Sequence, residues 1–114
     1  MSDESLMDPQ VWRELQETAG AEFTAELAQT FMDEAPGMLM ALEAAQAAGD
    51  ADAFRRAAHS IKSNAMTFGA TPLARRARAL ELGRLADADA AALTALRALW
   101  SSTAAVLKGH ADAA

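Results

Sequence analysis

The sequence predicts an all-α protein, folded as an antiparallel up-down-up-down four-helix bundle with a short extra helix at its N-terminal end. Hydrophobic residues make up 52% of the 114 residues, and most of them are alanine and leucine, which favour helix. Apolar residues recur at helical spacing, whereas no stretch alternates in the manner of a strand. A chain of this length fits one domain, which we place at 8–109, with flexible tails at 1–7 and 110–114.

The first two helices are bounded by residues that favour helix ends. Asp8 is a typical N-cap and Pro9 a typical first helical residue, so a short helix begins there and ends before Gly20. A long helix follows over about 21–48. Its apolar face comprises Leu27, Phe31, Met38, Leu42 and Ala45. Because Pro36 lies inside this stretch and removes one backbone hydrogen bond, we expect a kink there or a division into two helices.

A third helix is predicted over about 52–68, and its buried face can be told from its exposed face. Five apolar residues fall within about 40° of one line: Phe54, Ala58, Ile61, Ala65 and Phe68. His59 lies roughly 140° from that line, so we expect it to point into solvent. Its neighbours one turn away are Arg55, Arg56, Lys62 and Ser63. Gly69 then ends the helix.

Two further helices complete the predicted bundle. Thr71 and Pro72 form another cap-and-proline pair, and the helix they start buries Leu73, Ala77 and Leu80. Gly83 ends or loosens this helix. Asp87 or Asp89 caps the last one, and Gly109 lies just past its end. The inner face of that last helix includes Leu93, Leu96, Trp100 and Leu107.

The composition excludes several classes of protein. There is no cysteine, so disulfides and thiol chemistry are excluded. We expect no apolar run to be long enough to cross a membrane, and the acidic start "MSDESLMDPQ" is unlike a secretory signal. The net charge of −6 argues weakly against nucleic acid as a partner. We therefore expect a cytoplasmic, soluble helical domain.

The charge is unevenly distributed along the chain. Seven of the ten basic residues lie between Arg55 and Arg84, where Glu81 is the single acid. The remainder of the chain is strongly acidic. This polarity predicts a basic face for an acidic partner, although a solvated surface on two neighbouring helices would account for it equally well.

His59 lacks the partners that most histidine chemistry requires. A metal site needs further His, Cys or carboxylate ligands on the same face, and His110 has no partner at ligand spacing either, so we expect no metal. No hydrolase triad, glycine-rich phosphate loop or kinase signature is present. One remaining possibility is a neutral imidazole that attacks phosphorus, with a partner's Mg²⁺ supplying charge stabilisation. An exposed histidine without a function is the alternative that geometry leaves open.

The stretch "HSIKSNAMTFGA" resembles the signature of histidine phosphotransfer (HPt) domains of multistep phosphorelays. The residues that match in order are His59, Ile61, Lys62, Ser63, Asn64, Ala65, Gly69 and Ala70. The flanking segments "EAPGMLMALEAAQAAGDADAFRRAAHS" and "LARRARALE" resemble the family as well. The resemblance covers roughly 8–107, which is essentially the whole predicted bundle.

The resemblance implies a role for each residue of the site. His59 would be phosphorylated on Nε2, and Lys62 would contact the phosphoryl group. Ser63 stands where the family usually has glycine, a small residue that lets a receiver domain approach. It would weaken close docking or add a hydrogen bond. Glu81 stands where a Gln or Glu hydrogen-bonds the other imidazole nitrogen, although pairing with Arg78 or Arg84 in its own helix is an equal alternative.

The resemblance also implies a docking surface around His59. Met66 is apolar on the exposed face and would lie under a hydrophobic helix of a receiver domain. Arg55 and Arg56 would meet the receiver's acidic pocket, with the arginines of the next helix widening the basic patch, and Asn64 replaces a common serine. Three residues of the first helix region either cap the bundle or join this surface: Met7, Val11 and Trp12.

Together these observations predict a monomeric phosphoryl carrier rather than an autonomous enzyme. It would need no cofactor of its own, with Mg²⁺ on the partner. Its partners would be receiver domains of response regulators and of hybrid histidine kinases, with no nucleic acid and no membrane. One rival is an HPt-like module that binds a receiver or a kinase without phosphotransfer. The other is a nucleic-acid-binding bundle that uses the 55–84 patch, which the low aromatic content and the acidic remainder disfavour.

Overall fold

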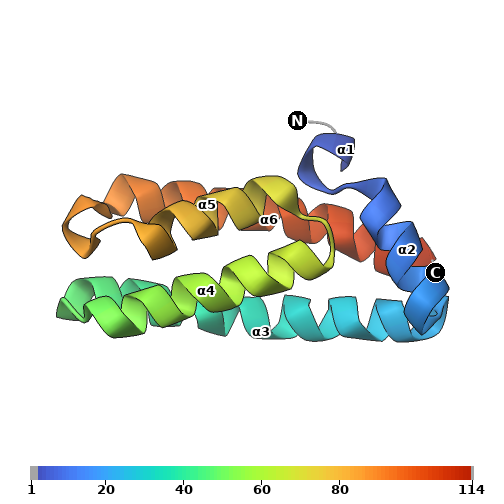
Figure 1. The fold of residues 1–114 in the computed structure, drawn as a ribbon, viewed down its shortest axis with the longest axis horizontal. Coiled ribbons are helices and arrows are strands. Elements are labelled where there is room, and N and C mark those ends of the chain that lie inside the picture. The colour runs from blue at the N-terminus through green and yellow to red at the C-terminus, as the bar shows by residue number, and fades with distance from the viewer. Residues whose placement is uncertain (1–2, 114) are drawn as a thin grey trace.

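The four longest helices of the computed structural model lie side by side along its long axis (Figure 1). The structure describes residues 3–113. Its elements in chain order are α1 (Asp3–Leu6), α2 (Pro9–Ala19), α3 (Ala21–Ala48), α4 (Ala51–Thr67), α5 (Thr71–Leu82), the 3₁₀ turn η1 (Leu85–Asp87) and α6 (Ala90–Ala113). None of the described residues forms a strand, and the all-α class predicted from the sequence is confirmed.

Neighbouring helices in the chain are also neighbours in space. α3 packs on α4, α4 on α5, α5 on α6, and α6 returns to α3, so the four helices enclose one core. At one end α2 packs against α3, while α1 contacts both α5 and α6 (Figure 1). The predicted short leading helix is α2, and the four-residue α1 before it was not anticipated.

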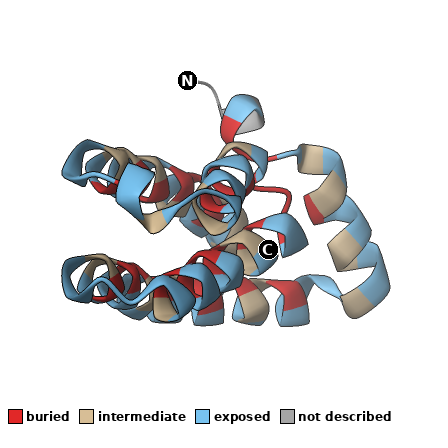
Figure 2. Ribbon diagram, turned by 60° about the vertical axis from the view of Figure 1, so that its left-hand side comes forward, coloured by how far each residue is buried: buried red, intermediate tan, exposed pale blue. Residues whose placement is uncertain are grey.

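The buried residues lie where the helices face one another (Figure 2). All five residues of the predicted α4 face are buried, as is Trp100 of α6. Phe31 and Phe68 stack in parallel with ring centroids 5.7 Å apart, and Trp100 tilts against Phe31 at 5.0 Å. Met7 and Trp12 are buried too, so these two residues close the end of the bundle.

Most of the predicted helix ends are found, but one cap differs. Asp8, Asp50 and Asp89 each accept a hydrogen bond from a backbone N–H of the first turn that follows, which settles the choice between Asp87 and Asp89 for α6. Thr71, in contrast, was wrongly expected to cap α5. It is the first residue of that helix, and its hydroxyl donates back to the carbonyl of Gly69 (3.4 Å).

α3 passes through Pro36 as one helix, so the alternative of two separate helices is wrong. Pro36 is exposed, on the side of α3 away from the core. Water can therefore reach the backbone carbonyl that the proline leaves without a donor one turn earlier. The neighbouring core residues Ala35 and Leu39 stay buried on either side of it.

α6 is longer than the sequence suggested, because it continues through Gly109 to Ala113. The helix thus extends beyond the boundary we expected at 109, just as Leu6 and Met7 join the core ahead of the boundary we expected at 8. α6 is also long and apolar enough to span a membrane by length and composition alone, contrary to expectation. Core helices of soluble proteins pass the same test, and α6 buries a row of apolar residues in the bundle: Leu93, Leu96, Trp100, Val106 and Leu107.

Candidate functional site

The hairpin of α4 and α5 brings together residues that are distant in the sequence. The two helices are joined by a tight turn in which Ala70 N–H donates to the Ala65 carbonyl (2.8 Å). Gly69 has a φ of +73°, a conformation that residues with a side chain rarely adopt. As a result His59 of α4 lies next to Glu81 of α5, 22 residues later.

The turn also holds α2 in place. The backbone N–H of Asp8 donates to the Gly69 carbonyl (2.8 Å). A β-carbon on Gly69 would lie 2.8 Å from the Val11 Cβ and 3.2 Å from the Asp8 carbonyl oxygen, which is too close for ordinary packing. The approach of α2 to the turn therefore requires glycine at this position.

Glu81 contacts two cation-forming side chains of α4 at once. Its Oε2 lies 2.5 Å from His59 Nδ1, and its Oε1 accepts a hydrogen bond from Lys62 Nζ (2.8 Å). The Glu81 side chain is only 13% exposed, whereas that of His59 is 57% exposed. A shielded carboxylate thus fixes one edge of an imidazole whose other edge faces outward.

The charge state of Glu81 decides which imidazole nitrogen is free. The hydrogen bond from Lys62 holds the pKa of the Glu81 carboxyl below its ordinary value; burial opposes this effect and the contact with His59 reinforces it. An ionised Glu81 can only accept, so His59 Nδ1–H donates to it and the lone pair of neutral His59 resides on Nε2. The Ser63 hydroxyl lies 3.4 Å from Nε2, within reach of a weak hydrogen bond.

The sequence matches the Hpt domain family over residues 26–106, about 70% of the chain, and the match includes the whole His59 helix. The chain belongs to the Hpt domain family. Its fold is similar to the crystal structure of histidine-containing phosphotransfer protein B (HptB) from Pseudomonas aeruginosa PAO1, with a TM-score of 0.77, 29% identity and 96% of each chain covered. A comparison with curated protein sequences gave no match.

In this Hpt domain the remaining predicted site residues differ in their exposure and in the contacts they make. Met66 is 61% exposed on the same helix, as expected. Arg55 pairs with Asp52, and Arg56 is exposed on the side of α4 that faces α3, beside Met38. The Asn64 side chain donates to the Ser60 carbonyl of its own helix (2.9 Å), so its amide group is already engaged.

Two contacts of the Hpt site were not foreseen. Glu81 pairs with Lys62 in addition to His59, and Arg84 pairs with Asp87 (3.1 Å) rather than with Glu81. A residue on one helix can be matched to a partner on the next only when the register of the hairpin is known. The signal available in the sequence was that Glu81 is the single acid among seven cations.

Proposed function

We propose that this chain carries a phosphoryl group on His59 between receiver domains of a phosphorelay. His59 Nε2 takes the group from an aspartyl phosphate of one receiver and passes it to the aspartate of another. The contact between His59 Nδ1 and Glu81 carries the proposal, because it leaves Nε2 unprotonated at the exposed edge of the ring. Membership of the Hpt domain family supports the same reaction.

The proposed transfer forms one bond and breaks one. The Nε2 lone pair attacks phosphorus, the P–O bond to the receiver aspartate breaks, and that aspartate leaves as a carboxylate. Nδ1 keeps its proton, so the product is a phosphoimidazolium whose positive charge lies against the Glu81 carboxylate. The phosphohistidine is a good donor for the same reason, because the imidazole leaves neutral when the next aspartate attacks.

Two side chains of α4 near His59 support the phosphoryl group in this scheme. Lys62 Nζ is already held beside the imidazole by Glu81, and it turns its ammonium group toward the phosphoryl oxygens when they arrive. The Ser63 hydroxyl, 3.4 Å from Nε2, donates to one of the same oxygens. Serine therefore adds a hydrogen bond where the smaller glycine would give only space.

The same proposal assigns the other functions to the partner. Mg²⁺ and the acidic residues that bind it belong to the receiver, and the chain acts as a carrier with no cofactor, kinase or ATPase activity of its own. We expect a cytoplasmic monomer, an up-down-up-down bundle that meets response regulators and hybrid kinases through the exposed face of α4. Met66 supplies apolar contact there, and the polar docking residues around it are Arg55, Arg56 and Asn64.

A transfer assay tests the proposal. Receiver domains phosphorylated with radiolabelled phosphate are mixed with the wild-type chain and with His59→Gln. Label should reach the wild type as an acid-labile, base-stable adduct and should be absent from His59→Gln. If receivers bind but transfer no label, the chain is an interaction module without phosphotransfer.

A further inference from the structure

The last turn of α5 carries Glu81 and ends at an exposed residue, Leu82, whose exposed fraction is 69%. The turn contains no basic residue, and the Glu81 carboxylate lies at the negative end of the helix dipole, which disfavours it. His59 and Lys62 contact this carboxylate, but both contacts are between side chains and do not fix the backbone of the turn. Since helix ends fray, the position of Glu81 depends on what holds the chain that follows.

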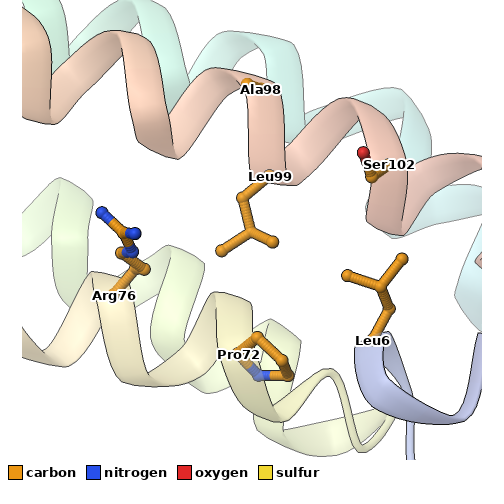
Figure 3. Close-up of a pocket in the computed structure, with 6 residues that line it drawn as sticks. All are labelled: Leu6, Pro72, Arg76, Ala98, Leu99 and Ser102. Atoms are coloured by element: carbon orange, nitrogen blue, oxygen red, sulfur yellow. The ribbon is translucent and has the colours of Figure 1, made fainter. Parts of the chain in front are cut away.

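The beginning of α5 is held in a different way from its end. Leu73 in the first turn is completely buried. Leu6 of α1 and Leu99 of α6 point into the space beside Pro72, so apolar side chains of two other helices surround the start of α5 (Figure 3). The end of α5 instead continues into the loop that leads to α6.

This loop, residues 83–89, is tied to α3 by one side chain. Gln46 Nε2 donates to the carbonyl of Ala88 (3.1 Å), which lies 42 residues later in the chain. Ala88 is only 6% exposed, and a carbonyl in such surroundings needs a donor. Arg84 and Asp87 also pair within the loop, but both side chains are largely exposed, and exposed pairs stabilise little. The bond from Gln46 is therefore the polar contact that fixes the loop on the bundle.

We propose that Gln46 is a positioning residue for phosphoryl transfer at His59. Its amide holds the loop against α3, which keeps the last turn of α5 helical and Glu81 in contact with His59 Nδ1. Gln46 takes no part in the chemistry and acts only through Glu81. The inference rests on the proposed function, because it takes His59 to be the residue that reacts.

Three substitutions separate this role from general stabilisation of the bundle. Gln46→Met keeps the length and the helix propensity of the side chain but removes its donor. Gln46→Lys retains a donor at the same position. Glu43→Ala is the matched control, because Glu43 and Gln46 line one groove between α3 and α6. It removes the ion pair with Arg97 and leaves the bond to Ala88 in place. Thermal melting verifies that each variant folds.

The tautomer of His59 is the most direct measure of the proposed role, because Glu81 fixes it. The ¹⁵N shifts of the imidazole are measured by NMR at a pH where the ring is neutral. The wild type, Gln46→Lys and Glu43→Ala should all show a protonated Nδ1 and a free Nε2. Gln46→Met should shift toward the tautomer protonated on Nε2, and an unchanged tautomer in this variant would overturn the inference.

The rate of phosphoryl loading provides the second measure. We expect Gln46→Met to slow loading of His59 from phosphoramidate about three- to tenfold, less than the loss of Glu81 itself, whereas Gln46→Lys and Glu43→Ala should load within about twofold of the wild type. Because Gln46 acts through Glu81, Gln46→Met should slow loading no further in a Glu81→Ala background. Equal slowing in both backgrounds would show that Gln46 acts by another route. Equal slowing by Gln46→Met and Glu43→Ala would attribute the effect to destabilisation of the bundle.

The two measures also distinguish failure of this inference from failure of the proposed function. The tautomer is measured on the unphosphorylated chain and requires no transfer. If neither phosphoramidate nor any receiver labels the wild type but Gln46→Met still shifts the tautomer, phosphotransfer fails and Gln46 does position Glu81. If the wild type loads and Gln46→Met changes neither tautomer nor rate, the proposed function stands and the inference is wrong.

Discussion

The two histidines of this chain occupy regions that differ in one respect, namely what the neighbouring helix places against the ring. His59 on α4 faces the Glu81 carboxylate of α5 at 2.5 Å. His110 in the last turn of α6 lies against the Trp12 indole, with ring centroids 5.2 Å apart, and no described side chain hydrogen-bonds to it. The carboxylate fixes the tautomer of His59 and leaves Nε2 of the neutral ring unprotonated. The indole only packs against the His110 ring and fixes no tautomer. A partner from another element thus distinguishes the proposed phosphoryl acceptor from a histidine that packs against an aromatic ring.

The sharpest test of this comparison replaces each histidine in turn. We expect His59→Asn to lose all labelling, both by radiolabelled phosphoramidate, a small phosphoryl donor, and by phosphorylated receiver domains. The reason is that no other imidazole of the described residues is oriented by a carboxylate. His110→Asn should be labelled as fully as the wild type. Label quantified on gels after base treatment distinguishes the two, and residual label on His59→Asn would show that His110 or another residue also accepts phosphate.

The next effect in size comes from removing the carboxylate while keeping the histidine. We expect Glu81→Ala to slow loading of His59 by roughly ten- to a hundredfold, by analogy with the loss of a carboxylate that orients a metal-ligating histidine. Glu81→Gln should lose less, because its amide oxygen still accepts from Nδ1–H. Loading rates from phosphoramidate measure both.

A second interhelical carboxylate provides the control for Glu81. Glu43 of α3 pairs with Arg97 of α6, so this ion pair joins two helices other than those that carry His59 and Glu81. Glu43→Ala removes an ion pair between helices without touching the imidazole, so its loading rate should equal that of the wild type. A comparable loss in Glu43→Ala would attribute the effect of Glu81→Ala to general destabilisation of the bundle.

The structural role of His110 predicts a modest effect on stability. We expect His110→Ala to lower the free energy of unfolding by about 0.5–1.5 kcal/mol through loss of the ring pair with Trp12. For a domain of this size that is a fall in Tm of a few degrees. Calorimetric melting measures it, His110→Phe should restore most of it, and a change in loading rate would show that the two regions are coupled.

The smallest expected effect is a pH dependence of stability that is due to Glu81. Because its pKa in the folded chain lies below the ordinary value of 4.5, Glu81 stabilises the fold above pH 4.5, and this contribution is lost as the pH falls through the lowered pKa. The difference in unfolding free energy between the wild type and Glu81→Gln should therefore shrink on acidification below pH 4.5. Urea titrations at a series of pH values test this, and a constant difference would contradict it.

Features that follow from local periodicity were predictable from the sequence. The buried face of α4 and the exposure of His59 both follow from the rotation of about 100° per residue in an α-helix, and both are found. The contact between Glu81 and His59 was expected only through the family resemblance, because it depends on the register of α4 against α5. The pairing of Glu81 with Lys62 depends on the same register and was missed.

The ends of the chain show a second limit of prediction from sequence. Gly109 is a typical residue after a helix end, but α6 continues past it to residue 113. The ring of His110 packs on Trp12 of α2 there, a long-range contact that no local rule includes. Similarly, Leu6 and Met7 resemble a tail in the sequence and lie in the core, because α1 returns to contact α5 and α6.

Gly69 links the hairpin that carries His59 to helix α2 at the end of the bundle. It joins α4 to α5 in the turn that brings Glu81 next to His59, while the space left by its missing side chain admits Val11 of α2. The distance between α2 and the hairpin is therefore set by one absent methyl group. A side chain at this position would therefore push α2 away from the hairpin, although Gly69 itself carries no charge and lies outside every helix.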